Sequence, residues 1–274
     1  MMSSATSERI PVLLLTGYLG AGKTTVLNHL LGLPEVRGRQ PVLLINEFGA
    51  LGVDAQRLAS TGVRALQINR GSLFCACTQV ALLEALSEVA AMAAVGLLLV
   101  EATGVSETRD LEGVLDVPML AGRFAVRANL CLVDAAHFTA VAPFLRAAGS
   151  QVCAADGLVL NKADLVTPDE LARLGRLLGD MNRRAAQITV QHGCIPWSFI
   201  DGLKHERTPE PPLAAAPAAL SSVSLSPPGT ADREAFAAAV QGLNERLLRL
   251  KGHVRFDDTV RLVELAGGRY TRPQ

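Results

Sequence analysis

Residues 16–31 read TGYLGAGKTTVLNHLL, and they join a short apolar run to a segment whose apolar residues recur with helical spacing. The stretch contains the pattern Gly-x-x-x-x-Gly-Lys-Thr, from Gly17 to Thr24. Between a strand and a helix, such a loop turns its backbone N–H groups toward phosphate oxygens, and the helix dipole adds positive charge. The alternative, a glycine-rich turn without a ligand, is disfavoured by the complete pattern in this context. The stretch therefore predicts a site for a nucleoside triphosphate.

The residues of this loop have separate expected roles. Lys23 is expected to reach the β- and γ-phosphates, and the Thr24 hydroxyl is expected to ligate Mg²⁺. The rest of the phosphate contact is expected from the loop and the start of its helix, at Gly17, Gly20, Ala21, Gly22 and Thr25.

Short apolar runs alternate with helical patterns over the first 200 residues. The runs are nearly continuously apolar, as strands covered on both faces must be. They predict an α/β fold of the P-loop NTPase kind, a mostly parallel sheet with helices on both faces and right-handed connections. The expected strands are 11–16, 41–46, 65–69, 96–102, 130–135, 157–164 and 187–191. The expected helices are 23–33, 79–92, 107–115, 137–148 and 169–182.

The regular alternation ends near residue 205, which divides the chain into three predicted parts. Residues 1–205 form the P-loop domain, and the Pro-, Ala- and Ser-rich residues 206–230 form a linker. Residues 231–274 form a small C-terminal α+β piece, a helix followed by one or two strands. About forty residues form little core alone, so this piece is expected to pack on the first domain or on another chain.

The composition gives no sign of a nucleic-acid or membrane partner. The 26 Lys and Arg residues balance 26 Asp and Glu residues, so no overall charge attracts polyanions or an anionic membrane. The first apolar run, residues 12–15, is too short for a signal peptide or a membrane span. Five cysteines without framework spacing indicate a reducing compartment. We therefore expect a cytoplasmic protein.

Residues 161–164 read Asn-Lys-Ala-Asp and follow an apolar strand pattern. The Asp164 carboxylate can accept from guanine N1–H and the exocyclic amine, whereas adenine offers neither donor there. Asn161 is expected to support the loop, and the Lys162 stem can lie over the base. The alternative is an ordinary strand–turn with a surface Asp. After a P-loop, the pattern favours guanine over adenine.

Two further carboxylates end expected strands. Glu101 can hold Mg²⁺ through water, and the N–H of nearby Gly104 can approach the γ-phosphate. Lys23, Thr24 and Glu101 are therefore the candidate catalytic set. Asp134 is either a second carboxylate of the site or a cap for the following helix.

Taken together, these segments resemble the CobW-like branch of the metallochaperone and metalloenzyme-activator GTPases. The resemblance implies a slow GTPase that uses GTP and Mg²⁺ to switch between metal-holding and metal-releasing states. It implies Zn²⁺ or Co²⁺ as cargo, a client metalloprotein and a possible homodimer as partners, and a switch region at 46–49 with Asp54. The resembling segments are 17–31, 45–56, 100–107, 132–138, 151–166 and 248–256.

The cysteine motif departs from the family pattern Gly-Cys-x-Cys-Cys. In one alignment, Cys75 and Cys77 correspond to the first two family cysteines. In the other, Cys77 alone corresponds to the third. Two thiolates can still bind Zn²⁺, Cu(I) or Co²⁺, with Glu47 as a further candidate ligand. Both precede an expected helix N-terminus, which favours the thiolate. A redox pair or structural thiols are the alternatives, and loop solvation is the alternative for Glu47 and Asp54.

The remaining cysteines and histidines have simpler expected roles. Their apolar surroundings predict core positions for the thiols of Cys131, Cys153 and Cys194. His192 is expected beside the base, with the Cys194 loop, and His205 and His253 are expected at the surface.

Three functions remain open on these residues. The first is a GTP-hydrolysing metal chaperone, and the second is a metal-independent GTP switch that assists assembly of a protein partner. The third, a P-loop ATPase or small-molecule kinase, is opposed by Asn161 and Asp164. The C-terminal segment looks shorter than the family usually has, which puts its partner surface in doubt.

Overall fold

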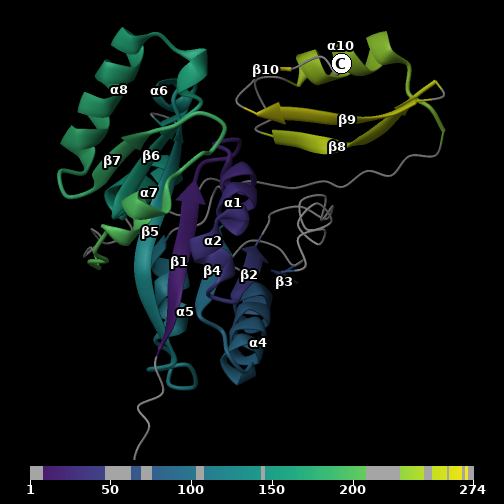
Figure 1. Cartoon of the computed structure of the whole chain (residues 1–274). Helices are drawn as coiled ribbons and strands as arrows, with labels where there is room; N and C mark the ends of the chain where they lie inside the picture. Colours follow the sequence, from purple (N-terminus) through teal and green to yellow (C-terminus); the bar gives the residue numbers. More distant parts are fainter. Residues whose placement is uncertain are drawn as a thin grey trace, which may run out of the picture.

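A seven-stranded parallel sheet forms the middle of the larger unit (Figure 1). The computed structural model describes residues 9–46, 63–68, 76–102, 108–142, 146–207, 229–243, 249–257, 259–266 and 269–270. The strand order is β3-β2-β4-β1-β5-β6-β7. The strands are β1 (Ile10–Gly17), β2 (Pro41–Asn46), β3 (Arg64–Ile68), β4 (Leu97–Glu101), β5 (Phe124–Asp134), β6 (Gly157–Asn161) and β7 (Ala186–Thr189). The predicted fold class is confirmed.

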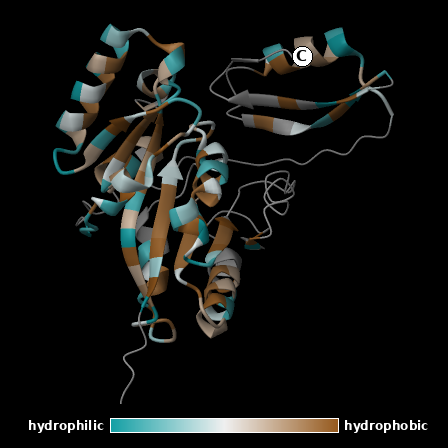
Figure 2. Cartoon of the chain, viewed as in Figure 1, coloured by the Kyte–Doolittle hydropathy of each residue, from teal (hydrophilic) through white to brown (hydrophobic). Residues whose placement is uncertain are grey.

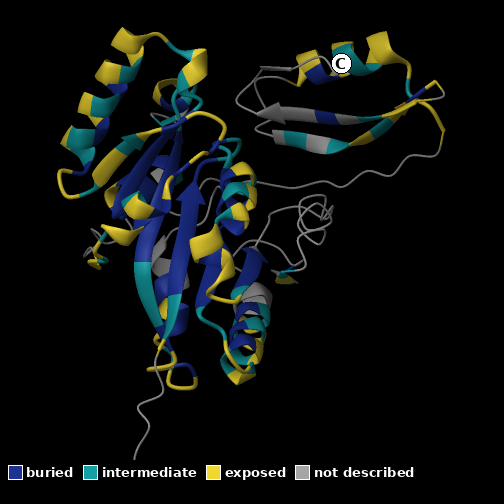
Figure 3. Ribbon diagram, in the orientation of Figure 1, coloured by how far each residue is buried: buried dark blue, intermediate teal, exposed yellow. Residues whose placement is uncertain are grey.

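Helices cover both faces of this sheet because successive strand residues point to opposite sides. In β1, Leu13 and Leu15 pack toward one layer, while Val12 and Leu14 pack toward the other. The first layer contains α1 (Lys23–Gly32), α2 (Pro34–Arg37) and α9 (Trp197–Asp201). The second contains α4 (Ala76–Ala91), α5 (Thr108–Leu115), α7 (Arg146–Cys153) and α8 (Pro168–Met181). Figures 2 and 3 show the central strands as hydrophobic and buried.

Several predicted element boundaries change, and the strand expected at 157–164 ends at Asn161. The strand expected at 130–135 begins earlier, at Phe124, because the residues before its apolar run also pair with β1. The helix expected at 137–148 is two helices, α6 (Phe138–Val141) and α7, and Pro143 lies between them in the sequence. A proline lacks the N–H that a continuous helix needs. The helix expected from residue 79 is α4, which already begins at Ala76.

The C-terminal unit is a three-stranded antiparallel sheet with one helix. It contains α10 (Arg233–Gly242), β8 (Arg249–Phe256), β9 (Thr259–Ala266) and β10 (Arg269–Tyr270). Phe236 of α10 meets Phe256 of β8 edge-to-face, with ring centroids 5.4 Å apart. Val240 and Val263 are buried with them. The sequence predicted the helix and the following strands, but not the third strand.

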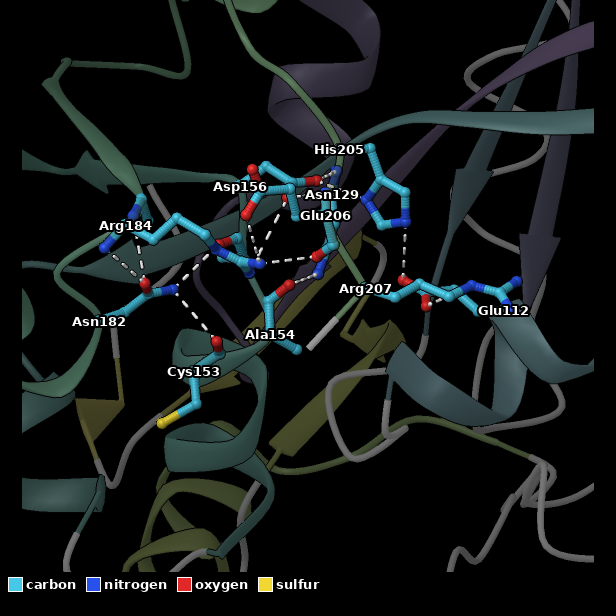
Figure 4. A network of polar contacts seen from close by, with 12 residues as sticks. Glu112, Asn129, Cys153, Ala154, Asp156, Asn182, Arg184, His205, Glu206 and Arg207 are labelled. Carbon is cyan, nitrogen blue, oxygen red and sulfur yellow. Dashed lines mark hydrogen bonds and ion pairs between the residues drawn. The ribbon is translucent and has the colours of Figure 1, made fainter. Parts of the chain in front are cut away.

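The exit segment, residues 203–207, stays with the larger unit. The buried Asp156 carboxylate accepts hydrogen bonds from the Asn129 N–H (2.7 Å), from His205 Nδ1 (2.8 Å) and from the Glu206 N–H (3.2 Å). Figure 4 shows Asp156 and His205 directed toward each other within this network. The prediction of a surface His205 is therefore wrong, since a buried carboxylate fixes its ring.

The exit segment also reaches helix α5. His205 Nε2 and Arg207 Nε each lie 3.6 Å from a carboxylate oxygen of Glu112 (Figure 4). Arg207 also pairs with Asp116. Contacts with the larger unit thus continue two residues past the predicted linker boundary.

No helix in the described part of the chain is both long and apolar enough to cross a membrane.

Candidate nucleotide-binding site

The candidate site lies where the carboxyl ends of four parallel strands meet. Strand β1 lies between β4 and β5. Strands β2, β3 and β4 all lie on one side of β1, and strands β5, β6 and β7 lie on the other, so the strand order changes direction at β1. In open parallel sheets, such a switch point places ligands just outside the strand ends. The loop after β1, residues 17–22, and the loop after β6, residues 161–164, both lie at this edge.

The loop after β1 has a backbone that only glycine adopts readily. Gly17, Gly20 and Gly22 have φ angles of 128°, 82° and 99°. A Cβ on Gly17 would lie 2.4 Å from the Leu132 carbonyl oxygen, and one on Gly22 would lie 2.4 Å from Asn161 Nδ2. The residues thus form a cradle of bare backbone, which fits a phosphate chain.

Lys23 begins helix α1 directly after this cradle. Its Nζ donates to the carbonyl oxygens of Gly17 (2.9 Å) and Tyr18 (3.4 Å), so the ammonium lies against the loop itself. Ala21 is buried in the loop, and Thr25 is exposed in the first turn of α1. The loop therefore combines backbone N–H groups, a helix N-terminus and a cation.

Thr24 and Glu101 meet beside the cradle. The Thr24 hydroxyl donates to Glu101 Oε1 at 3.2 Å, and Glu101 ends β4 with only 8% of its surface exposed. A hydroxyl and a carboxylate oxygen are the hard ligands that Mg²⁺ prefers. The two residues fit a magnesium ion next to the phosphates, where it would neutralise developing negative charge.

Asn161 connects the loop after β1 with the region after β6. Its buried side chain donates through Nδ2 to the Ala21 carbonyl (2.9 Å) and accepts at Oδ1 from the Gly193 N–H (3.0 Å). The sequence predicts a supporting role for Asn161 but not its contact with Gly193. The sequence feature that could have indicated this contact is a glycine shortly after a strand. Gly193 has a φ of 71°.

Asp164 is exposed at the start of a short 3-10 helix, η2 (Ala163–Leu165). A hollow beside this loop is lined by residues 188–192 together with Ala163, Cys194 and Pro196. His192 thus lies in the same hollow as Ala163, which is next to Asp164 in the sequence. An exposed carboxylate beside a hollow can accept hydrogen bonds from a base.

Lys162 and Asp134 form an ion pair, with Nζ 2.7 Å from Oδ2. Neither role predicted for Asp134 describes this contact. The N-cap of α6 is His137 and not Asp134. The Asp134 carboxylate instead accepts a hydrogen bond from the Ala136 N–H and contacts His137 Nδ1 within the turn.

The predicted transition-metal residues fall mostly outside the described residues. Glu47, Asp54, Cys75 and Gly104 lie outside them, as does most of the predicted switch region. Cys77 belongs to the first turn of α4, so it does not precede the helix as predicted. Among the described residues, no group of three or more His, Cys, Asp or Glu side chains could hold a metal ion.

The other cysteines only partly follow the predictions. Cys131 is buried as expected, and this burial raises the pKa of its thiol to about 12. Cys153 and Cys194 are exposed, so their predicted core positions are wrong. Cys153 is the last residue of α7, and Cys194 lies in a turn, where its N–H donates to the Gln191 carbonyl. His253 is exposed, as predicted.

The fold and the cradle define a P-loop nucleotide-binding protein. The model of the CobW/HypB/UreG nucleotide-binding domain matches residues 11–196, and the chain belongs to this family. The model of the cobalamin synthesis protein cobW C-terminal domain matches residues 220–274.

Two curated relatives are 32% and 27% identical to the chain over the residues that align. The zinc chaperone YjiA of Escherichia coli K12 is 32% identical over 191 residues, which cover 68% of this chain and 59% of the relative. The zinc chaperone CobW of Pseudomonas aeruginosa PAO1 is 27% identical over 233 residues, which cover 73% and 62%. The chain thus matches about 60% of the length of these relatives.

The crystal structure of Zn(II)-bound YjiA GTPase from E. coli has a similar fold. It superposes with a TM-score of 0.52 at 23% identity, covering 96% of this chain and 88% of the other. The similarity in fold therefore covers the larger unit and the C-terminal unit.

Proposed function

We propose that this protein binds GTP with Mg²⁺, hydrolyses it slowly, and uses it to control delivery of a zinc-type divalent cation to a client metalloprotein. The observation that supports the nucleotide part is the Asn161 side chain, which bonds to Ala21 in the loop after β1 and to Gly193 beside the loop after β6. This link would hold the two loops together where one ligand engages both.

In this proposal Lys23 binds the β- and γ-phosphates, and Thr24 and Glu101 hold the magnesium ion. Bound magnesium would supply charge neutralisation at the phosphates. Asp164 selects guanine, because its carboxylate would lack donors from adenine. Gly104 is proposed to donate its N–H to the γ-phosphate. Within the residues that the structure describes, no side chain is assigned to activate water, so we expect slow turnover that a partner or the cargo accelerates.

The metal part rests on the relatives and on the cysteine motif. YjiA, YeiR and CobW are named zinc chaperones, and Cys75, Cys77 and Glu47 provide ligand types that bind Zn²⁺ or Co²⁺. We also propose a homodimer around the nucleotide as a partner state. We place the activity in the cytoplasm, because GTP and reduced thiols are available there.

The test is a titration of reduced, metal-free protein with Co²⁺ and Zn²⁺, with and without GTP and Mg²⁺. We expect Co²⁺–thiolate absorption that changes with GTP and disappears in the Cys75→Ser, Cys77→Ser double variant. The matched control is the Cys153→Ser variant, which removes an exposed thiol outside the motif. Unchanged bands in the first variant would contradict the metal assignment.

The second candidate is a metal-independent GTP switch that assists assembly of a protein partner. The presence of two cysteines where the family pattern has three favours it. It predicts GTP turnover without any Co²⁺–thiolate absorption, and the same titration distinguishes the two functions.

A further inference from the structure

An ion pair at the ends of β5 and β6 lies next to the predicted guanine loop. Asp134 is the last residue of β5 and pairs in register with Asn161, the last residue of β6. The Ala135 N–H donates to the Asn161 carbonyl at 3.0 Å, which continues the strand pairing into the turn. This alignment places Asp134 Oδ2 2.7 Å from Lys162 Nζ. The parallel sheet, not chance side-chain contact, therefore brings the two charges together.

The Asp134 carboxylate is held in place before Lys162 is considered. Its Oδ1 accepts from the Ala136 N–H at 3.0 Å, and its Oδ2 lies 3.0 Å from His137 Nδ1. The imidazole donates in the tautomer that has its proton on Nδ1. Only 12% of the Asp134 side chain is exposed, so water competes weakly for these bonds. The carboxylate is thus a fixed acceptor.

Lys162 is constrained from its backbone outward. Its φ and ψ are 61° and 36°, a left-handed conformation that is uncommon outside glycine, asparagine and aspartate. Such a backbone persists when surrounding contacts over-determine it. Here the preceding Asn161 is bound to two loops, and the Lys162 ammonium is bound to Asp134. With both ends held, the four-carbon stem of Lys162 must span the gap between the ends of β6 and β5.

We propose that Asp134 is a positioning residue for guanine nucleotides: it holds the Lys162 ammonium, and thereby fixes the Lys162 stem as an apolar surface against the base. Asp134 itself does not touch the nucleotide. The inference rests on the proposed guanine site, and it adds to that site a residue 28 positions before Lys162 in the sequence. The proposal also explains why the Lys162 ammonium points toward Asp134 and not toward the base. In the proposal the apolar stem of Lys162, and not its charge, contacts the base.

An unheld lysine would lose this function for an entropic reason. A lysine side chain has four rotatable bonds, and ordering it on binding lowers affinity. The ion pair orders the stem in advance, so the nucleotide meets a prepared surface. Removing the Asp134 charge should therefore weaken binding of the base and leave binding of the phosphates unchanged.

The experiment measures GDP and tripolyphosphate affinity of the full chain by displacement of a fluorescent guanine nucleotide. Asp134→Asn should weaken GDP binding about tenfold, or about 1.4 kcal/mol, with tripolyphosphate affinity unchanged. In turnover, it should raise the KM for GTP and leave kcat unchanged. Asp201→Asn is the matched control, because it removes a 2.6 Å ion pair, with Arg127, away from the site.

Lys162→Met provides the second, independent variant, because methionine keeps an apolar chain and removes the ammonium. It should weaken GDP binding to a similar extent, and adding Asp134→Asn should cost nothing further. Additive losses in the double variant would overturn the proposal, as would wild-type GDP affinity in either single variant. If Asp134→Asn fails to fold, the Lys162→Met result alone decides.

Asp164→Asn separates this inference from the proposed function. If that variant loses its preference for GDP over xanthosine diphosphate while Asp134→Asn binds GDP normally, the guanine site stands and the positioning role fails. If wild-type protein shows no preference for guanine over adenine nucleotides, the proposed function itself fails.

Discussion

At the residue scale, Gly22 has no room for a side chain beside Asn161. Its φ of 99° disfavours a side chain, and a Cβ would lie 2.4 Å from the Asn161 amide nitrogen. Gly22→Ala should therefore push Asn161 away from the Ala21 carbonyl and weaken GTP binding by at least tenfold. Displacement of a fluorescent nucleotide checks this loss. Gly32→Ala is the control, since a Cβ there meets nothing within 4 Å.

A second prediction at this scale concerns Glu112. Burial raises the pKa of its carboxyl above the ordinary value of 4.5, against the opposing effect of His205 and Arg207. A raised folded-state pKa means that the folded protein binds this proton more tightly than the unfolded chain. Its stabilising effect is present below pH 4.5 and is lost as pH rises through the folded-state pKa.

Replacing Glu112 with Gln should therefore flatten this part of the pH profile. The stability of Glu112→Gln relative to wild type should rise as pH increases above about 4.5, and urea unfolding at several pH values measures it. Glu88→Gln, which removes an exposed pair with Arg64, should show no such trend. A constant difference between Glu112→Gln and wild type would contradict the assignment.

At the element scale, helix α8 begins with a complete capping box. The Thr167 hydroxyl accepts from the Glu170 N–H, and the Glu170 carboxylate accepts from the Thr167 N–H, with Pro168 as the first helical residue. Thr167→Ala should lower the free energy of unfolding by about 1 kcal/mol. Urea denaturation measures the change, and Thr139→Ala, at an exposed position of α6, should have little effect. Equal stability in both variants would contradict a capping role.

Element positions were the most predictable part of the structure. The strands β1, β2, β4 and β6 are nearly continuously apolar because helices cover both faces, and such runs are readable in one sequence. Strand β5 extended beyond its apolar run because pairing with β1, not hydrophobicity, ordered residues from Phe124. Pairing over long sequence separations leaves no local pattern.

Separation in the sequence also decides which contacts of the site could be predicted. The glycines and Lys23 lie within eight residues of sequence, so their pattern indicates a cradle directly. The contact of Asn161 with Gly193 joins residues 32 apart, and the ion pair of Asp134 with Lys162 joins residues 28 apart. Such partners become visible only when the sheet aligns the strand ends.

At the scale of the whole molecule, the exit segment decides where the larger unit ends. A chain that stops after Arg207 keeps the bonds from His205 and Glu206 to Asp156, whereas one that stops after Leu203 leaves this buried carboxylate with fewer donors. The shorter chain should lose about 2 kcal/mol, or roughly 4–8 °C in Tm. Scanning calorimetry compares the two. Equal Tm values would contradict the role of the exit segment.

The bridge formed by Asn161 has a consequence for how binding strength is built. In the proposed site, one amide group would set the spacing between the phosphate half-site and the base half-site. A nucleotide would then act on them as a bivalent ligand whose covalent linkage matches a fixed gap. Once one end is bound, the other meets its half-site at a high effective concentration. Guanosine and tripolyphosphate added as separate molecules should therefore compete far more weakly than GTP, and loosening the bridge should narrow that difference. In the proposed site, the gain in affinity from joining the two ends of the nucleotide thus depends on one side chain.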